Sequence, residues 1–274
     1  MSILNEYNEL KKLFLLSQSN LNNMCNKSIY QRVVIVGASS GIGLEVARLF
    51  VNAGCMVGLA ARRTAPLLEL KKIAPERIFV KYLDVTAPAA LAAATELVNQ
   101  MGGMDLYVHV AGIGKQNRTL RPDIEMDTFC TNVTGFGQMI GWAYRYFTLV
   151  KKGHIAAVSS IAGTKGLGVA PAYSATKRFQ NTYLQALAQQ AQMEKLPIVF
   201  TDIRPGFVDT ALLSGGQKYP MMMKPEKVAQ SIVRAISQKK RVKVIDWRYA
   251  ILTFFWRCIP DFIWERLVIR TKSK

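Results

Sequence analysis

Histidine, cysteine and acidic side chains are all scarce in this sequence. Its two histidines, His109 and His154, are too few for a histidine-rich metal site, and we interpret both as structural. Its four cysteines form no C-x-x-C pair, which argues against a zinc site or a disulfide framework and fits a reducing, cytoplasmic compartment. We therefore predict no metal site and disfavour a histidine-based catalytic triad.

The shortage of acidic residues leaves a strongly basic chain. Lysine and arginine number 36 against 18 aspartate and glutamate, a net charge of +18. Such a protein attracts anions, which include nucleic acid, anionic lipid and phosphorylated ligands. The sequence has no zinc-finger spacing, no RNA-recognition signature and no long basic tract, so we expect no nucleic-acid partner.

Long hydrophobic runs are missing at both ends of the chain. Residues 13–16 form an apolar run of four, shorter than the roughly 7–15 residues of a signal peptide. Residues 1–29 are expected to be a poorly ordered extension, and initiation at Met1 or at Met24 stays open. Near the other end, residues 249–256 form an uncharged run of eight, against the roughly 18 that a membrane-spanning helix requires.

Short β-branched and apolar segments alternate with segments of helical period. The sequence predicts strands over 32–36, 55–60, 78–83, 106–110, 154–158 and 197–203, and helices that include 86–101 and 124–147. This alternation predicts an α/β fold, a doubly wound parallel sheet (Rossmann fold) with helices on both faces. We place this single domain at 30–240 of the 274 residues, followed by a basic and aromatic segment over 241–274.

A glycine-rich turn follows the first predicted strand. Gly37, Gly41 and Gly43 lie between that strand and a segment of helical period. Strand, glycine turn and helix together indicate dinucleotide binding, because the turn brings backbone N–H groups and the helix dipole to the pyrophosphate.

The second predicted strand ends at Arg62 and Arg63, where NAD-binding folds carry an acidic residue for the ribose 2′-hydroxyl. A guanidinium suits a 2′-phosphate instead. We therefore expect NADP(H) to be preferred over NAD(H), with Arg62 as first choice and Arg63 as alternate.

Tyr173 and Lys177 are four residues apart in a predicted helix that begins near Pro171. A free tyrosine has a pKa of about 10, and a neighbouring ammonium favours the phenolate. The pair is therefore a candidate proton-transfer device, although this spacing also occurs by chance in many helices.

Ligands of doubly wound parallel sheets bind beyond the carboxyl ends of the strands. Five residues at those ends should line one crevice: Gly37, Asp84, Ala111, Ser160 and Pro205.

With these motifs in this order, residues 31–235 or so resemble the short-chain dehydrogenase/reductase family. The motifs are Gly37-x-x-x-Gly41-x-Gly43, Asp84-Val85, Ala111-Gly112, Asn132, Ser160, Tyr173-x-x-x-Lys177 and Pro205-Gly206. The chain departs from the family pattern at Val36, where threonine is usual, and at His109-Val110, where two asparagines are usual. The bonding that ties the glycine turn to the central strands must therefore differ here.

The resemblance implies catalytic roles for Asn132, Ser160, Tyr173 and Lys177. Tyr173 would be the general acid or base, and Lys177 would hold the nicotinamide ribose and lower the tyrosine pKa. Ser160, favoured over Ser159 by its spacing from the tyrosine, would bind the substrate oxygen, and Asn132 would hold a water that links Lys177 to solvent. The expected cofactor-binding residues are Gly37, Ser39, Ser40, Gly41, Ile42, Gly43, Arg62, Arg63, Asp84, Val85, Ala111, Gly112, Tyr173, Lys177, Pro205, Gly206, Val208 and Thr210.

Two segments outside these motifs bear on the substrate. The resemblance places a substrate lid at about 211–224, where glycines, a proline and methionines suit a mobile loop over an apolar pocket. The segment 241–274 carries three of the four tryptophans, interleaved with arginine and lysine. It either contacts a membrane surface peripherally, at the cytoplasmic face, or packs on the sheet domain.

The sequence thus favours an NADP(H)-dependent oxidoreductase that interconverts a carbonyl and a secondary alcohol of a small, lipophilic substrate. The alternative is a non-catalytic dinucleotide-binding redox sensor or scaffold. The resemblance also implies a homodimer or homotetramer.

Overall fold

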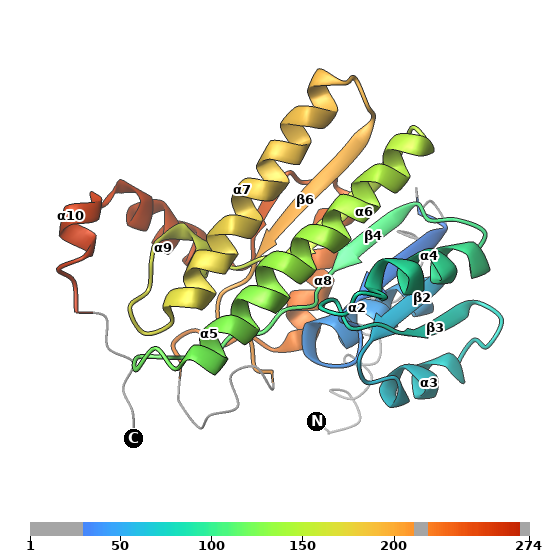
Figure 1. Ribbon diagram of the computed structural model, residues 1–274, viewed down its shortest axis with the longest axis horizontal. Coiled ribbons are helices and arrows are strands. Elements are labelled where there is room, and N and C mark those ends of the chain that lie inside the picture. Colours follow the sequence, from blue (N-terminus) through green and yellow to red (C-terminus); the bar gives the residue numbers. More distant parts are fainter. Residues whose placement is uncertain (1–29, 211–218, 269–274) are drawn as a thin grey trace, which may run out of the picture.

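A parallel sheet of seven strands forms the centre of the molecule (Figure 1). The computed structural model describes residues 30–210 and 219–268. The expected N-terminal extension (1–29), most of the expected lid (211–218) and the last six residues (269–274) lie outside the described residues. The strands are β1 (Arg32–Val36), β2 (Met56–Ala61), β3 (Ile78–Tyr82), β4 (Leu106–His109), β5 (Gly153–Val158), β6 (Ile198–Arg204) and β7 (Val242–Val244).

The strand order β3-β2-β1-β4-β5-β6-β7 confirms the predicted doubly wound fold. From β1 the chain builds outward to β2 and β3, and then crosses back to β4 on the other side of β1. This reversal between β1 and β4 is the switch point at which such sheets bind ligands beyond the carboxyl ends of the strands.

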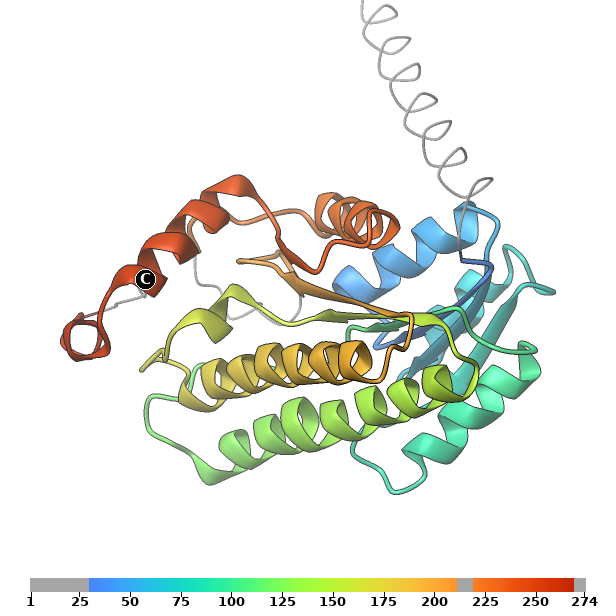
Figure 2. The same cartoon turned by 90° about the horizontal axis from the view of Figure 1, so that it is seen from above.

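Helices cover both faces of the sheet, so that the molecule has three layers (Figure 2). The helices are α2 (Gly41–Asn52), α3 (Ala65–Lys71), α4 (Ala90–Gln100), α5 (Pro122–Phe129), α6 (Phe136–Leu149), α7 (Pro171–Met193), α8 (Pro225–Ser237), α9 (Trp247–Cys258) and α10 (Asp261–Trp264). Alternate residues of β1 point to opposite faces: Val33 and Ile35 pack with α2, α3 and α8, whereas Val34 and Val36 pack with α4, α6 and α7.

The helix expected over 124–147 is interrupted. A π-helical turn, η1 (Cys130–Gly135), lies between α5 and α6. A Cβ at Gly135 would lie 2.8 Å from the Val85 side chain, so η1 packs closely on the loop after β3. π-Helical turns often occur at functional sites, and this one carries Asn132.

The last strand and helix α9 belong to the folded body. β7 pairs with β6 beyond Lys240, so the segment assigned to 241–274 begins inside the sheet. Tyr249 on α9 is fully buried, and its hydroxyl accepts a hydrogen bond from Phe207 N and lies 2.9 Å from Pro220 O. The aromatic residues of this segment divide between the core and the surface, because Trp264 is also buried whereas Trp247 and Phe254 are exposed.

Candidate active site

The glycine turn between β1 and α2 packs against the loop after β4. Gly37 has a φ of +91°, and a Cβ there would lie 2.4 Å from Ala111 N. A Cβ at Gly43 would lie 2.1 Å from Gly37 O. Larger residues at these two positions would push the turn away from the sheet, which explains the glycines.

Backbone groups replace the side-chain bonding that the family pattern supplies at Val36 and His109. Val36 O accepts hydrogen bonds from Val110 N and Ala111 N, at 2.8 and 3.0 Å. His109 Nδ1 lies 2.9 Å from the Tyr107 hydroxyl, and burial lowers the pKa of His109 to about 3, so the imidazole is neutral. At these two positions the local bonding therefore consists of the backbone hydrogen bonds of Val36 and the buried pair of Tyr107 and His109.

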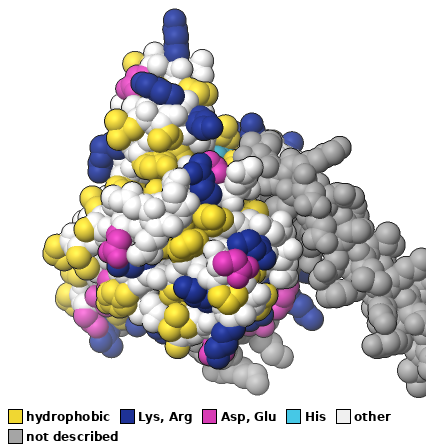
Figure 3. Space-filling view, turned by 90° about the vertical axis from the view of Figure 1, so that its right-hand side faces the viewer, with side chains coloured by type: hydrophobic (Ala, Val, Ile, Leu, Met, Phe, Trp, Pro, Cys, Tyr) yellow, Lys and Arg dark blue, Asp and Glu magenta, His cyan; other side chains and the backbone are white. Residues whose placement is uncertain are grey.

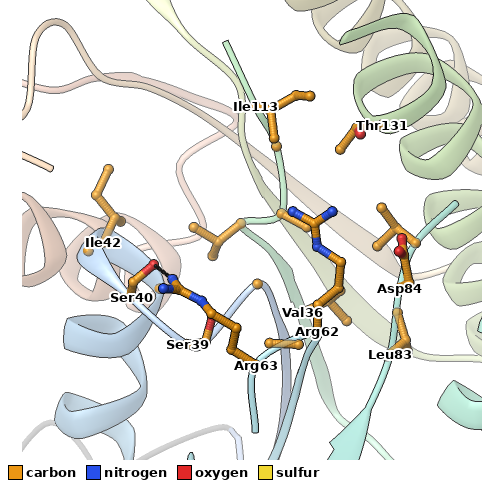
Figure 4. Close-up of a pocket in the computed structure, with 18 of the residues that line it drawn as sticks. Val36, Ser39, Ser40, Ile42, Arg62, Arg63, Leu83, Asp84, Ile113 and Thr131 are labelled. Atoms are coloured by element: carbon orange, nitrogen blue, oxygen red, sulfur yellow. Dashed lines mark hydrogen bonds between the residues drawn. The ribbon is translucent and has the colours of Figure 1, made fainter. Parts of the chain in front are cut away.

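A pocket of about 500 Å³ opens beyond the carboxyl ends of β1, β2 and β3 (Figure 4). Arg63 donates a hydrogen bond of 2.9 Å from Nη2 to the Ser40 hydroxyl on the glycine turn, so its guanidinium lies over that turn. Arg62 extends into the middle of the pocket, beside Asp84. Burial raises the pKa of Asp84, but hydrogen bonds from Thr86 and the charge of Arg62 outweigh that effect and leave it below its ordinary value.

The residues around this pocket fit a dinucleotide. The first turn of α2 faces it, and the Ser40 side chain makes no capping bond to that turn within the described part of the chain. The turn's backbone N–H groups are therefore available to an anionic ligand. The predicted cofactor residues in the lining are Gly37, Ser39, Ser40, Gly41, Ile42, Gly43, Arg62, Arg63, Asp84, Val85, Ala111, Gly112 and Thr210.

A second pocket of about 230 Å³ adjoins the first, and the two share Ile42, Val110, Gly112, Ile113 and Thr210. Its lining is predominantly apolar. Its walls hold nine residues of the predicted site: Ile42, Gly112, Ser160, Tyr173, Lys177, Pro205, Gly206, Val208 and Thr210.

Ser160 follows β5 and caps the 3₁₀ turn η2 (Ile161–Thr164). Its Oγ accepts a hydrogen bond of 3.0 Å from Ala162 N, which leaves its hydroxyl proton to donate elsewhere. The neighbouring Ser159 hydroxyl instead donates to buried Asp202, which Asn181 and Arg204 also contact. The Ser159 hydroxyl is thus held in that buried network, and the preference for Ser160 stays a prediction.

Tyr173 and Lys177 lie one turn apart on α7, with Lys177 Nζ 5.7 Å from the centre of the tyrosine ring. Burial raises the pKa of Tyr173, and a hydrogen bond with Ser160 opposes this effect. Burial is the larger of these two effects, and the expected lowering of the Tyr173 pKa by Lys177 stays a prediction. Gly114 passes over the ring, and a Cβ there would lie 2.4 Å from Tyr173 Cδ2.

Lys177 is buried, and burial lowers its pKa to about 8 in spite of the nearby charge of Asp202. Its Nζ donates hydrogen bonds to Val158 O and to Gln180 Oε1, at 3.3 and 3.0 Å. Gln180 Nε2 in turn donates to the backbone oxygen of Asn132, at 2.9 Å. The Gln180 side chain therefore connects Lys177 to the backbone of Asn132.

Asn132 is buried behind the two pockets and lines neither of them. Its side chain accepts a hydrogen bond from Ile113 N and donates to Ile113 O, at 2.9 and 2.7 Å, and so holds the loop after β4. It also donates to Thr176 on α7. Its expected role as a water ligand stays a prediction.

Three residues near the reacting groups, Gly114, Gln180 and Asp202, are missing from the sequence-based prediction. Gln180 is three residues after Lys177 in the helix, a spacing that places both on one face and could have pointed to the pair. The roles of Gly114 and Asp202 depend on contacts between elements far apart in the sequence.

Among the described residues, no group of three or more histidine, cysteine, aspartate or glutamate side chains could hold a metal ion. None of the helices in that part of the chain combines the length and hydrophobicity that a membrane crossing requires.

Residues 219–224, the described part of the expected lid, contact residues of the smaller pocket. Tyr219 stacks on Phe207 with 4.5 Å between ring centres, and Met223 pairs with Val208.

Comparison with known proteins agrees with this geometry. The family model described as short chain dehydrogenase matches residues 31–218. The chain is 29% identical over 266 residues to the dehydrogenase/reductase SDR family member 7B of Bos taurus, an alignment that covers 88% of this chain and 81% of that protein. It is 31% identical over 249 residues to an uncharacterized oxidoreductase of Mycobacterium tuberculosis, covering 86% of this chain and 96% of the relative.

Solved structures share the fold. A short-chain dehydrogenase from Streptomyces avermitilis superposes with a TM-score of 0.73 at 23% identity, over 82% of this chain and 92% of that one. A 3-ketoacyl-(acyl-carrier-protein) reductase from Brucella melitensis, crystallised with NADH, superposes with a TM-score of 0.70 at 23% identity, over 79% and 96% of the two chains.

Proposed function

Since the chain belongs to the short-chain dehydrogenase family and is an oxidoreductase of that family, we propose that it interconverts a carbonyl and a secondary alcohol with NADP(H) and Tyr173. One observation carries the proposal. Ser160, Tyr173 and Lys177 line an apolar pocket that shares a wall with the dinucleotide-sized pocket beyond β1 and β2. A carbonyl in the smaller pocket would thus be near both the catalytic side chains and the reactive end of a dinucleotide.

Each side chain has a defined task in carbonyl reduction. The Ser160 hydroxyl, which forms a hydrogen bond with Tyr173 here, donates its proton as a hydrogen bond to the substrate oxygen when substrate is bound, which stabilises the negative charge that develops there. Tyr173, kept protonated at neutral pH by its raised pKa, gives its proton to that oxygen. The Lys177 ammonium, 5.7 Å from the ring centre, stabilises the resulting phenolate. A nicotinamide held beside this pocket would supply the hydride, and alcohol oxidation would reverse these steps.

The preference for NADP(H) rests on Arg62 and Arg63. Both guanidinium groups come from the end of β2 and line the larger pocket, and Arg63 lies over the glycine turn through its bond to Ser40. A 2′-phosphate between two guanidinium groups gains charge-assisted hydrogen bonds that a 2′-hydroxyl does not. Asp84 follows β3 rather than β2, and its Oδ1 accepts hydrogen bonds from Thr86, so it does not take the position of the acidic ribose ligand of NAD-binding folds.

The substrate is proposed to be small and lipophilic because the smaller pocket is mostly apolar. The apolar side chains in its lining are Ile42, Val110, Ile113, Val158, Ile161, Ala162, Leu167, Val169, Ala170, Phe207, Val208 and Trp256. We further propose a cytoplasmic location, peripheral contact of the segment 241–274 with a membrane, and assembly into a homodimer or homotetramer.

The proposal is tested by NADPH oxidation over a panel of ketones and aldehydes of increasing chain length. Tyr173→Phe should lower kcat at least about 1,000-fold because it removes the transferred proton, while NADPH binding stays within a few-fold. Arg62→Ala and Arg63→Ala should weaken NADPH more than NADH. Turnover that is unchanged in Tyr173→Phe would overturn the mechanism. NADPH binding without turnover of any carbonyl would instead favour the redox sensor or scaffold.

A further inference from the structure

Helix α9 separates the smaller pocket from the outside of the molecule. On its inner face Tyr249 and Thr253 are buried, and Trp256, one helical turn further on, lines the pocket. Lys165 Nζ donates to Ile259 O just after the helix, and Trp264 Nε1 on α10 donates to Gly166 O. Residues 165 and 166 lead directly to Leu167 in the pocket wall, so α9 and α10 are fixed beside that wall.

The outer face of α9 is apolar and exposed. Trp247, Ile251, Phe254 and Phe255 have the i, i+4, i+7, i+8 spacing of one helix face. Their exposed fractions are 71%, 49%, 62% and 59%. The same kind of surface continues along α10 and the residues after it, where the exposed apolar side chains are Phe262, Ile263, Leu267 and Val268. We call these eight residues the aromatic face.

Basic residues border the aromatic face. Arg257 and Arg266 are exposed on α9 and beyond α10. Of the three acidic residues in this segment, Asp246 and Asp261 are in ion pairs with Arg248 and Lys165, and Glu265 is exposed beside Arg266. From Arg241 to Lys274 the sequence has eight lysine and arginine residues against three aspartate and glutamate residues. An apolar strip with a basic border is complementary to a surface of anionic lipid headgroups over acyl chains.

The position of the aromatic face leaves it accessible to a flat surface. α9 and α10 project from one end of the body in both ribbon views (Figures 1 and 2). On the other end of the molecule, hydrophobic, basic and acidic side chains are interspersed (Figure 3). A second copy of this chain is a poorer occupant of this face, because a symmetric contact would bring Arg257 and Arg266 close to the same residues of the partner copy, whereas an anionic membrane attracts them.

We infer that the aromatic face docks on an anionic phospholipid membrane and that a lipophilic substrate passes from the bilayer, beside α9, into the pocket behind Trp256. Tryptophan and phenylalanine rings would lie at the headgroup level, with Arg257 and Arg266 on lipid phosphates. The part of this inference that concerns the substrate rests on the proposed function, whereas the docking itself does not. The pocket and the membrane would then be on opposite faces of one helix.

The test is flotation of the full chain with phosphatidylcholine vesicles, with and without phosphatidylserine, at low and high salt. The variant is Phe254→Glu/Phe255→Glu. Its matched control is Leu149→Glu/Met193→Glu, which adds the same charge at side chains that are 80% and 76% exposed at the far ends of α6 and α7. We expect the wild type and the control to float with anionic vesicles, also at high salt. The α9 variant, Phe254→Glu/Phe255→Glu, should bind these vesicles at least about tenfold more weakly.

Equal binding by the α9 variant and the wild type would overturn the inference, and equal loss in both variants would show that net charge alone is responsible. If light scattering shows that the wild type and the control are dimers and the α9 variant is a monomer, a second copy covers this face instead.

Turnover of a soluble ketone and the melting temperature are recorded for each variant. Both should be unchanged in the α9 variant, while turnover of a ketone embedded in vesicles falls at least about tenfold. If the wild type does not turn over the soluble ketone, the proposed function is wrong. The flotation result alone then decides whether the aromatic face docks on the membrane.

Discussion

Lys177 is a cation held inside the protein by two neutral oxygens, Val158 O and Gln180 Oε1. Burial lowers its pKa to about 8 from an ordinary 10.5. Between these two values the unfolded chain binds more protons at this residue than the folded chain does. The contribution of Lys177 to the free energy of unfolding therefore rises with pH over this window. Its destabilising effect is complete below about pH 8 and disappears above about pH 10.5.

Lys177→Met isolates this effect, because all other titrating groups are common to both proteins. From pH 7 to pH 10.5 the free energy of unfolding of the wild type should rise relative to that of the variant by up to about 3 kcal/mol. Urea unfolding at several pH values measures the difference. A difference that stays flat over this range would contradict a lowered pKa for the buried ammonium.

Gln180 holds this ammonium, and its replacement by the apolar and only slightly smaller Leu removes the acceptor without opening a large cavity. A hydrogen bond to a charged group contributes about 1.5–3 kcal/mol, so kcat/KM should fall about 10- to 100-fold in Gln180→Leu. The pKa of Lys177 should fall further. The decline of activity on the alkaline side of the pH profile should therefore shift to lower pH. Gln185→Leu, an exposed position on the same helix, is the control. Lower activity with an unmoved alkaline limb would mean that Gln180 is merely structural.

The predictability of the site differs from residue to residue. Tyr173, Lys177 and Ser160 could be predicted because the spacing within one helix and the end of one strand place them. Gln180 could not, because its role requires the backbone oxygen of Asn132, which only the π-helical turn η1 brings within 2.9 Å. Asp202 is likewise part of a network whose members come from β6, α7 and the loop after β5.

At the scale of elements, the start of α9 decides where the aromatic face lies. Asp246 is the N-cap of α9, with a φ of +72°, and its side chain accepts a hydrogen bond of 2.9 Å from Arg248 N. The carboxylate also forms an ion pair with the Arg248 side chain. Aspartate and asparagine tolerate a positive φ better than most residues, so this position combines a cap with a reversal of the chain.

Asp246→Ala should lower the free energy of unfolding by about 1–2 kcal/mol, because it removes the cap and leaves alanine at a positive φ. Asp246→Asn retains the cap and the backbone preference and should cost only a few tenths of a kcal/mol. Urea unfolding measures both. If the two variants were equally unstable, the ion pair with Arg248 rather than the cap would be the stabilising contact.

Elements were predictable where their hydrophobic pattern was long enough. The six strands from β1 to β6 and the doubly wound order follow from apolar runs bounded by turns. β7 is not predictable in this way. It has only three residues, Val242–Val244, with a lysine in the middle and largely exposed side chains, a pattern that resembles a loop. Its position follows from pairing with β6, and the helix α9 that comes next is held by the burial of Tyr249.

At the scale of the whole molecule, the net charge of +18 acts on every anionic ligand. This long-range attraction is screened by salt, with a Debye length of about 10 Å at 0.1 M. NADPH carries up to about two more negative charges than NADH, on its 2′-phosphate. If that phosphate lies between Arg62 and Arg63, the two cofactors must differ in their dependence on salt.

The dissociation constant of NADPH should therefore rise more steeply with NaCl than that of NADH, as measured by cofactor fluorescence from low salt to about 0.3 M. Arg62→Ala and Arg63→Ala should each bring the two slopes closer together. Lys152→Ala removes the same charge just before β5, at the amino ends of the strands and away from the pocket, so both cofactors should lose affinity only slightly and equally. Parallel slopes in the wild type would mean that the general basic field attracts the pyrophosphate alone, and the preference for NADP(H) would then have no basis in these two arginines.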